Sequence, residues 1–194
     1  MWLDNPVRWG GLAALVAGAL LTISALLRLY IDLGNPAVLG AILLVDGWLG
    51  VFLAVLVQLG LVGLYAPQAR ATGILGLVGF VLGSAGIQLT MGASFVFAFS
   101  RPVVWPWEDP EYFERTIGAL AIFGLSFVLG WVLLGIAALR ARAYPRVAAM
   151  LLVAGSLILL IPLPLSDLIF AGSVAWLGYA LYEEGGAPVE PQAS

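Results

Sequence analysis

Long apolar runs, separated by short polar breaks, follow one another along the whole chain. Six runs can be distinguished, at residues 9–29, 36–65, 73–99, 116–139, 147–161 and 165–182. About 20 consecutive apolar residues in a helix span the hydrocarbon core of a bilayer. The pattern therefore predicts an all-α integral membrane bundle of about six transmembrane helices, with residues 1–194 forming a single transmembrane domain.

Prolines and hydroxyl residues lie where these helices are expected to begin or turn. Thr72 and Ser166 are expected to cap the third and sixth helices, and Pro110 to lie in the first turn of a helix that runs into the fourth. Pro162 and Pro164 allow either a tight hairpin or one kinked excursion. We favour the hairpin, because two spans of about 15 to 18 residues just suffice there.

The composition agrees with a membrane location and excludes several kinds of chemistry. Hydrophobic residues make up 62% of the chain and charged residues 10%, whereas soluble domains have about 45–50% and 25%. There is no Cys and no His, and all 8 basic residues are Arg. Zinc sites of the ordinary kind, histidine-ligated haem, His-dependent nucleophiles and Lys-containing phosphate loops are therefore not expected. We expect no cofactor, and the net charge of -3 argues against nucleic acid as a partner.

The arginines predict an orientation, because cytoplasmic loops of membrane proteins carry an excess of Arg and Lys. With six spans, one side receives Arg8, Arg70, Arg140, Arg142 and Arg146. The other side receives Arg28, Arg101 and Arg115, which lie among the carboxylates Asp32, Glu108, Asp109, Glu111 and Glu114. Both termini are therefore predicted to be cytoplasmic, and the first run is expected to be a retained helix.

Two turns in the sequence are alike. LVGLYAPQARATG at 61–73 and LLGIAALRARAYP at 133–145 match at Leu, Gly, Ala, Ala, Arg and Ala. A parallel duplication of a helix pair would produce this match, and so would chance in a chain rich in Leu, Gly and Ala. The stretches GLYAPQARATGILGLVGF and LLGIAALRARAYPRVAAMLL resemble phrases in uncharacterised small multi-pass bacterial membrane proteins. The resemblance implies the membrane class and no activity, cofactor or catalytic residue. We expect a location in a bacterial cytoplasmic (inner) membrane.

Small residues form stripes along two of the predicted helices. In the third run they are Gly76, Gly79, Gly83, Thr90 and Ser94, and in the first run Gly10, Ala14 and Gly18. Membrane helices associate through close backbone contact, which small residues allow. We therefore interpret both stripes as packing surfaces and not as ligand sites.

Asp46 is the first candidate for a functional residue. It follows Pro36 by ten positions, or about 15 Å of helix, within the otherwise apolar AILLVDGWLGVFL. A charged Asp near the bilayer centre costs about 2.5 to 3.5 kcal/mol on insertion scales, so it is expected to find a partner or stay protonated. One interpretation is a neutral Asp that hydrogen-bonds to Thr90 or Ser94, and the other is a cation, proton or ligand site.

Two further charged residues are candidates for the same region. Arg28 lies four positions before Asp32, which favours a local ion pair, although Arg28 is also a candidate partner for Asp46 or Asp167. Asp167 is most simply a first-turn carboxylate of the sixth helix. A catalytic aspartate pair is disfavoured, because neither VDGW nor LSDL matches the glycine-framed motif of intramembrane aspartyl proteases.

The polar connection at residues 100–115 interleaves aromatic rings with four carboxylates. Rings such as those of Trp105 and Trp107 are typical of a segment at the membrane surface, where they lie among the headgroups. The alternative interpretation is a lid over an outward-facing pocket that contains Asp46, Gln88, Thr90 and Arg101.

These residues predict a non-enzymatic protein that binds or transports a small apolar or cationic ligand in the outer half of the bundle. The competing hypothesis is an accessory or assembly subunit that contacts another membrane protein or a second copy of itself, and a membrane-embedded enzyme is the weakest of the three. Membrane lipids are expected partners in every case. A pocket enclosed by the chain's own helices would favour ligand binding, and an exposed groove lined by small residues would favour assembly.

Overall fold

The computed structural model describes residues 6–32, 39–99, 110–141, 146–161 and 165–184. These residues form six α-helices and one short 3-10 helix, and they contain no β-strand. The elements are α1 Pro6–Asp32, α2 Leu39–Tyr65, η2 Ala66–Gln68, α3 Ala69–Phe99, α4 Pro110–Ala141, α5 Arg146–Ile158 and α6 Ser166–Glu184. The all-α class predicted from the apolar runs is confirmed.

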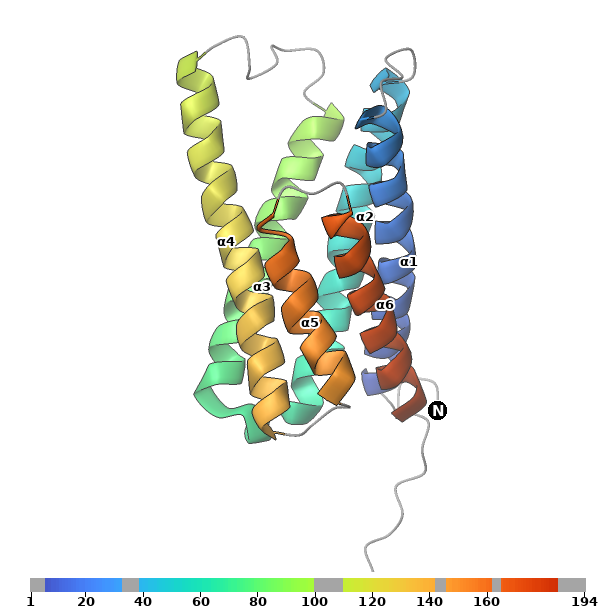
Figure 1. Ribbon diagram of the computed structural model, residues 1–194, viewed down its shortest axis with the longest axis vertical. Helices are drawn as coiled ribbons and strands as arrows, with labels where there is room; N and C mark the ends of the chain where they lie inside the picture. The colour runs from blue at the N-terminus through green and yellow to red at the C-terminus, as the bar shows by residue number, and fades with distance from the viewer. Residues whose placement is uncertain (1–5, 33–38, 100–109, 142–145, 162–164, 185–194) are drawn as a thin grey trace, which may run out of the picture.

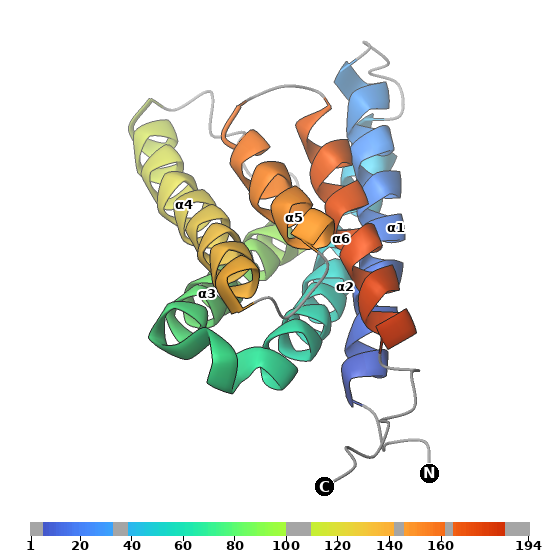
Figure 2. The ribbon, with the colours of Figure 1, turned by 60° about the horizontal axis from the view of Figure 1, so that its bottom comes forward.

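The helices follow one another around the bundle in chain order, and α6 returns to pack along α1 (Figures 1 and 2). The most extensive contacts are those of α1 with α6 and of α3 with α4. The starts of α1, α3 and α5 and the ends of α4 and α6 lie together at the bottom of Figure 1. Four exposed arginines, Arg8, Arg70, Arg140 and Arg146, belong to this end of the bundle, which we call the arginine end.

Three stretches of the described chain are long and apolar enough to cross a membrane, namely Val7–Leu27, Gly47–Phe95 and Ala121–Ala141. The second stretch covers most of both α2 and α3, between which the chain reverses direction. Helix α5 is apolar but has only 13 residues, or about 20 Å, which is less than the roughly 30 Å of a hydrocarbon core. The structure thus supports several membrane-crossing helices, and the count of six spans stays a prediction.

Close backbone contacts at glycine hold neighbouring helices together, as the small-residue stripes predict. Gly10 of α1 meets the backbone of Gly63 in α2, and Gly83 of α3 meets that of Gly130 in α4. A Cβ atom added at Gly10, Gly63 or Gly130 would overlap the backbone of the facing helix. Along the α1–α6 contact, a Cβ at Gly11 would lie 2.6 Å from the backbone nitrogen of Tyr182. Glycine is therefore required by packing at these crossings.

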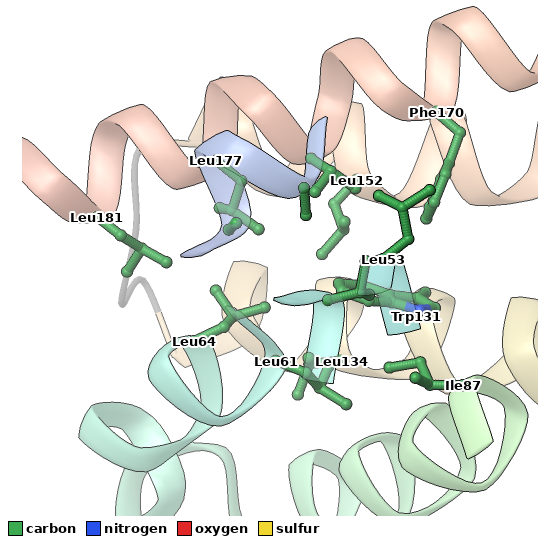
Figure 3. Packing of buried hydrophobic residues seen from close by; sticks show 14 of the residues in the cluster. Leu53, Leu61, Leu64, Ile87, Trp131, Leu134, Leu152, Phe170, Leu177 and Leu181 are labelled. Atoms are coloured by element: carbon green, nitrogen blue, oxygen red, sulfur yellow. The ribbon is translucent and has the colours of Figure 1, made fainter. Parts of the chain in front are cut away.

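A core of apolar side chains from all six α-helices fills the space between them (Figure 3). At its centre the Trp131 side chain packs edge-on against Phe170, with ring centroids 5.9 Å apart, and Phe127 completes an aromatic cluster. The exterior is apolar as well, with Ile74 81% and Ile122 63% exposed. An apolar interior combined with an apolar exterior is the pattern of a helix bundle that lies in lipid.

The turn between α2 and α3 differs from the prediction. Thr72 does not cap a helix, because its hydroxyl donates 2.9 Å to the carbonyl oxygen of Gln68 inside a helical turn that already begins at Ala69. The expected boundary appears instead as a kink at Gly73, whose φ of 57° and ψ of -148° suit glycine alone.

The other predicted boundaries agree more closely with the structure. Helix α4 begins at Pro110 and α6 at Ser166, with Asp167 in its first turn. The two stretches of the proposed repeat differ at their ends, since Ala66–Gln68 is a 3-10 helix whereas the matching residues 138–140 belong to α4. The duplication stays a prediction.

Candidate functional site

A groove of about 520 Å³ lies between α1 and α2 near the arginine end. Its shape follows from the close crossing at Gly10 and Gly63, because two helices that touch at their backbones leave a furrow beside the contact. The small buried residues Gly10, Ala13 and Gly63 form its floor, and the remaining lining residues are Val7, Trp9, Leu12, Val16, Leu56, Leu59, Val62 and Ala66.

The walls of the groove are large apolar side chains on the outside of the bundle. Trp9, Leu12 and Val16 of α1 stand opposite Leu59 and Val62 of α2, and all five are exposed. The lining contains no charged residue, so the groove offers a hydrocarbon chain dispersion contacts and offers an ion nothing to bind.

The nearest cation on α1 is already engaged by another helix. The guanidinium of Arg8 donates a 2.8 Å hydrogen bond to the hydroxyl of Tyr182 in α6 and lies 4.6 Å from the centre of that ring. Arg8 therefore ties α1 to α6 and does not line the groove. The groove consequently selects its occupant by shape and apolarity and not by charge.

Gln88 and Thr90, two predicted site residues, lie on opposite sides of α3. Two positions along a helix correspond to about 200° of rotation, so the two side chains do not line one pocket. The hydroxyl of Thr90 donates 2.8 Å to the carbonyl oxygen of Gly86 within its own helix. Both residues are exposed on the described bundle. The structure therefore does not bring Gln88 and Thr90 into one pocket, as the sequence analysis suggested.

The backbone of Asp46 lies in α2, but its side chain and that of Arg28 are outside the described part of the structure. Asp46 precedes Tyr65 by 19 positions, about 28 Å of helix. The α1–α2 register, in which Gly10 meets Gly63, carries Asp46 to the level of Leu27, where the apolar stretch of α1 ends. The role of Asp46, as a neutral hydrogen-bonding residue or as a cation, proton or ligand site, stays a prediction.

The remaining predicted site residues fall outside the groove. Arg101, Trp105 and Trp107 lie outside the described residues, so their roles as lid or aromatic belt stay predictions. Asp167 is half-buried in the first turn of α6, at the end of the bundle opposite the arginines. Sequence reasoning missed the groove because it searched for polar residues. The available signal was the small residues of the first two runs, which the structure pairs as Gly10 with Gly63 and Ala14 with Gly60.

Among the described residues, no group of three or more His, Cys, Asp or Glu side chains is placed to hold a metal ion. Besides the bond from Arg8 to Tyr182, a 3.0 Å hydrogen bond joins the Gln58 amide of α2, as donor, to the Ser84 hydroxyl of α3. No family model, curated protein or solved structure matches the chain. The groove is therefore interpreted from its own chemistry.

Proposed function

We propose that this protein crosses the membrane six times and binds the hydrocarbon chain of a membrane lipid in the groove between α1 and α2. The observation that carries the proposal is an apolar furrow of about 520 Å³ that opens on the exterior of the bundle. In a bilayer such a furrow faces acyl chains directly. Binding of an acyl chain there needs no polar group and no chemical reaction, which agrees with a non-enzymatic role.

The proposed ligand belongs to the half of the membrane nearest the arginine end. The groove extends from Val7 to Val16 on α1, the first half of that helix, and Arg8 marks the level of the headgroups. We propose that this side is the cytoplasmic face of a bacterial inner membrane, with both termini inside, because Arg8, Arg70, Arg140 and Arg146 gather there. This site replaces the outer-half pocket of the sequence-based hypothesis. The proposal concerns lipid binding and does not extend to transport.

A second candidate for the groove is a helix of another membrane protein. The small floor residues Gly10, Ala13 and Gly63 favour it, since small residues let a helix backbone approach closely. This candidate corresponds to the accessory or assembly role. The lipid is preferred because the bulky walls, Trp9, Leu12 and Leu59, project around that floor and suit a thin flexible chain better than a helix.

Narrowing the groove is expected to reduce lipid retention. Val62→Trp places a large ring at the rim of the groove, and Val147→Trp makes the same change on the outer surface of α5. The two valines are 43% and 59% exposed, so neither change is expected to disturb the core. Delipidated protein in mild detergent would be titrated with phosphatidylglycerol, and bound lipids would be counted by native mass spectrometry.

We expect the tightest lipid to bind about tenfold more weakly to Val62→Trp, equivalent to about 1.4 kcal/mol, and with unchanged affinity to Val147→Trp. Equal lipid retention by both variants would contradict the lipid proposal. Loss of a co-purified membrane protein from Val62→Trp, with lipid retention unchanged, would support the assembly role instead.

A further inference from the structure

Helix α3 has one side that no other helix of the described bundle covers. Its glycines at 79, 83 and 86 pack on α4, and the side chains at 84 and 94 face α2. The remaining side carries residues spaced alternately by four and three positions, and all of them are exposed. They are Ile74, Val78, Val81, Ala85, Gln88 and Gly92, which we call the open face of α3.

Gln88 is the polar residue of this open face, and it lies near mid-depth. The Gln58–Ser84 hydrogen bond and the contact of Gly50 with Ser94 fix how α3 runs alongside α2. In that register Gln88 is level with Val55 of α2. Val55 lies three residues from the midpoint of α2, which extends from Leu39 to Tyr65. If α2 crosses a bilayer, Gln88 is therefore close to the bilayer centre.

The exposed amide of Gln88 makes no hydrogen bond to the rest of the described chain. Exposed or half-exposed hydroxyls elsewhere in the bundle have a hydrogen-bond acceptor in their own helix. Thr90 donates to the carbonyl oxygen of Gly86, and Ser126 donates to that of Ile122. Lipid supplies no hydrogen-bond partner, so an amide left facing it is strongly disfavoured. The amide therefore requires a polar partner beyond the described residues of this chain.

Gly92 provides an independent observation on the same face. Gly79, Gly83 and Gly86 of α3 are in tight contact with α4, so packing within the chain explains them. A Cβ added at Gly92, in contrast, would meet nothing within 4 Å. Its small size serves no contact within the described bundle. Together with Ala85, one heptad earlier, it leaves room for another helix backbone to approach.

We propose that the open face of α3 is the interface of a symmetric dimer of this chain. A primary amide carries both a donor and an acceptor, so it is its own complement. Two copies inserted with the same orientation are related by a two-fold axis along the membrane normal, which packs their α3 helices in parallel. Each Gln88 then lies opposite the Gln88 of the other copy, with Ala85 and Gly92 at the close approaches. The inference is independent of the groove between α1 and α2, which lies between other helices.

The dimer constant in proteoliposomes, measured by single-molecule photobleaching over a range of protein-to-lipid ratios, tests the interface. We expect Gln88→Leu to weaken dimerisation by about 3- to 30-fold, the range of interhelical hydrogen bonds in membranes. Gly92→Leu is expected to weaken it further by blocking close approach. Gly124→Leu is the matched control, because a Cβ at Gly124 of α4 also meets nothing within 4 Å and the change leaves α3 intact.

Disulfide cross-linking supplies a second readout, since the chain has no cysteine of its own. Ala85→Cys and Gly92→Cys are each expected to cross-link to the same residue of a second copy under mild oxidation. Leu125→Cys, on the exposed side of α4, is expected not to cross-link. A wild-type protein that stays monomeric at all ratios, a dimer unaffected by both Gln88→Leu and Gly92→Leu, or equal cross-linking at Leu125→Cys would each overturn the proposal.

Discussion

Gly130→Val is expected to destabilise the bundle by about 3 kcal/mol or more, because the added side chain overlaps backbone and not a flexible side chain. A Cβ at Gly130 of α4 collides with the backbone nitrogen and Cα of Gly83 in α3. Neither atom can move unless the two helices separate along one of the most extensive contacts in the bundle. The free energy of unfolding in mixed micelles, followed by circular dichroism during an SDS titration, measures the effect.

The control for this prediction lies on the same helix. A Cβ at Gly124 meets nothing within 4 Å, so Gly124→Val is expected to change the free energy of unfolding by no more than about 0.5 kcal/mol. Both variants replace Gly with Val on α4, so only the contact with α3 differs between them. Equal stability of the two variants would mean that α3 and α4 do not meet at Gly83 and Gly130.

Trp131→Ala is expected to cost about 3 to 5 kcal/mol, because it leaves a cavity in the middle of the core. The Trp131 side chain is only 2% exposed and contacts the rings of Phe127 and Phe170. Trp131→Phe is expected to cost less than about 1.5 kcal/mol. It keeps most of the ring volume, and the indole N–H that it removes has no hydrogen-bond partner in the described structure.

Trp176→Ala supplies the comparison on the outside of the bundle. Trp176 of α6 is 55% exposed, so its removal opens no cavity and is expected to change the free energy of unfolding by about 0.5 kcal/mol or less. The same SDS titration serves all three tryptophan variants. A Trp131→Ala protein as stable as Trp176→Ala would contradict the packing of the aromatic cluster at the centre of the core.

The helices were predictable because bilayer physics leaves the sequence few alternatives. An apolar run in lipid must satisfy its backbone hydrogen bonds internally, so the runs predict helices whose ends the structure reproduces within a few residues, except at the start of α4. The kink at Gly73, near the start of α3, was harder to predict. The hydroxyl of Thr72 bonds back to the carbonyl oxygen of Gln68 within a helical turn, and the backbone of Gly73 then changes the direction of the chain.

The candidate site was less predictable, because it is built from contacts between distant segments. Small residues at Gly10 and Gly63 were visible in the sequence, but only the fold reveals that they touch and leave a furrow beside them. Gln88 and Thr90 looked like neighbours in one pocket, whereas their separation of two residues sends them to opposite sides of α3. The search for polar residues pointed to the end of the bundle opposite the arginine end, whereas the side chains that line the groove are all apolar.

The central claim is that this bundle crosses a bilayer with its arginine end in the cytoplasm, and cysteine labelling tests it most directly. Ala71→Cys lies at the arginine end, near the start of α3, and Glu111→Cys lies in the first turn of α4 at the opposite end. Each variant, in a chain with no other cysteine, would be treated with an impermeant maleimide in intact spheroplasts and in inverted membrane vesicles. We predict that Glu111→Cys reacts only in spheroplasts and Ala71→Cys only in inverted vesicles. Labelling of both positions from the same side would contradict the claim.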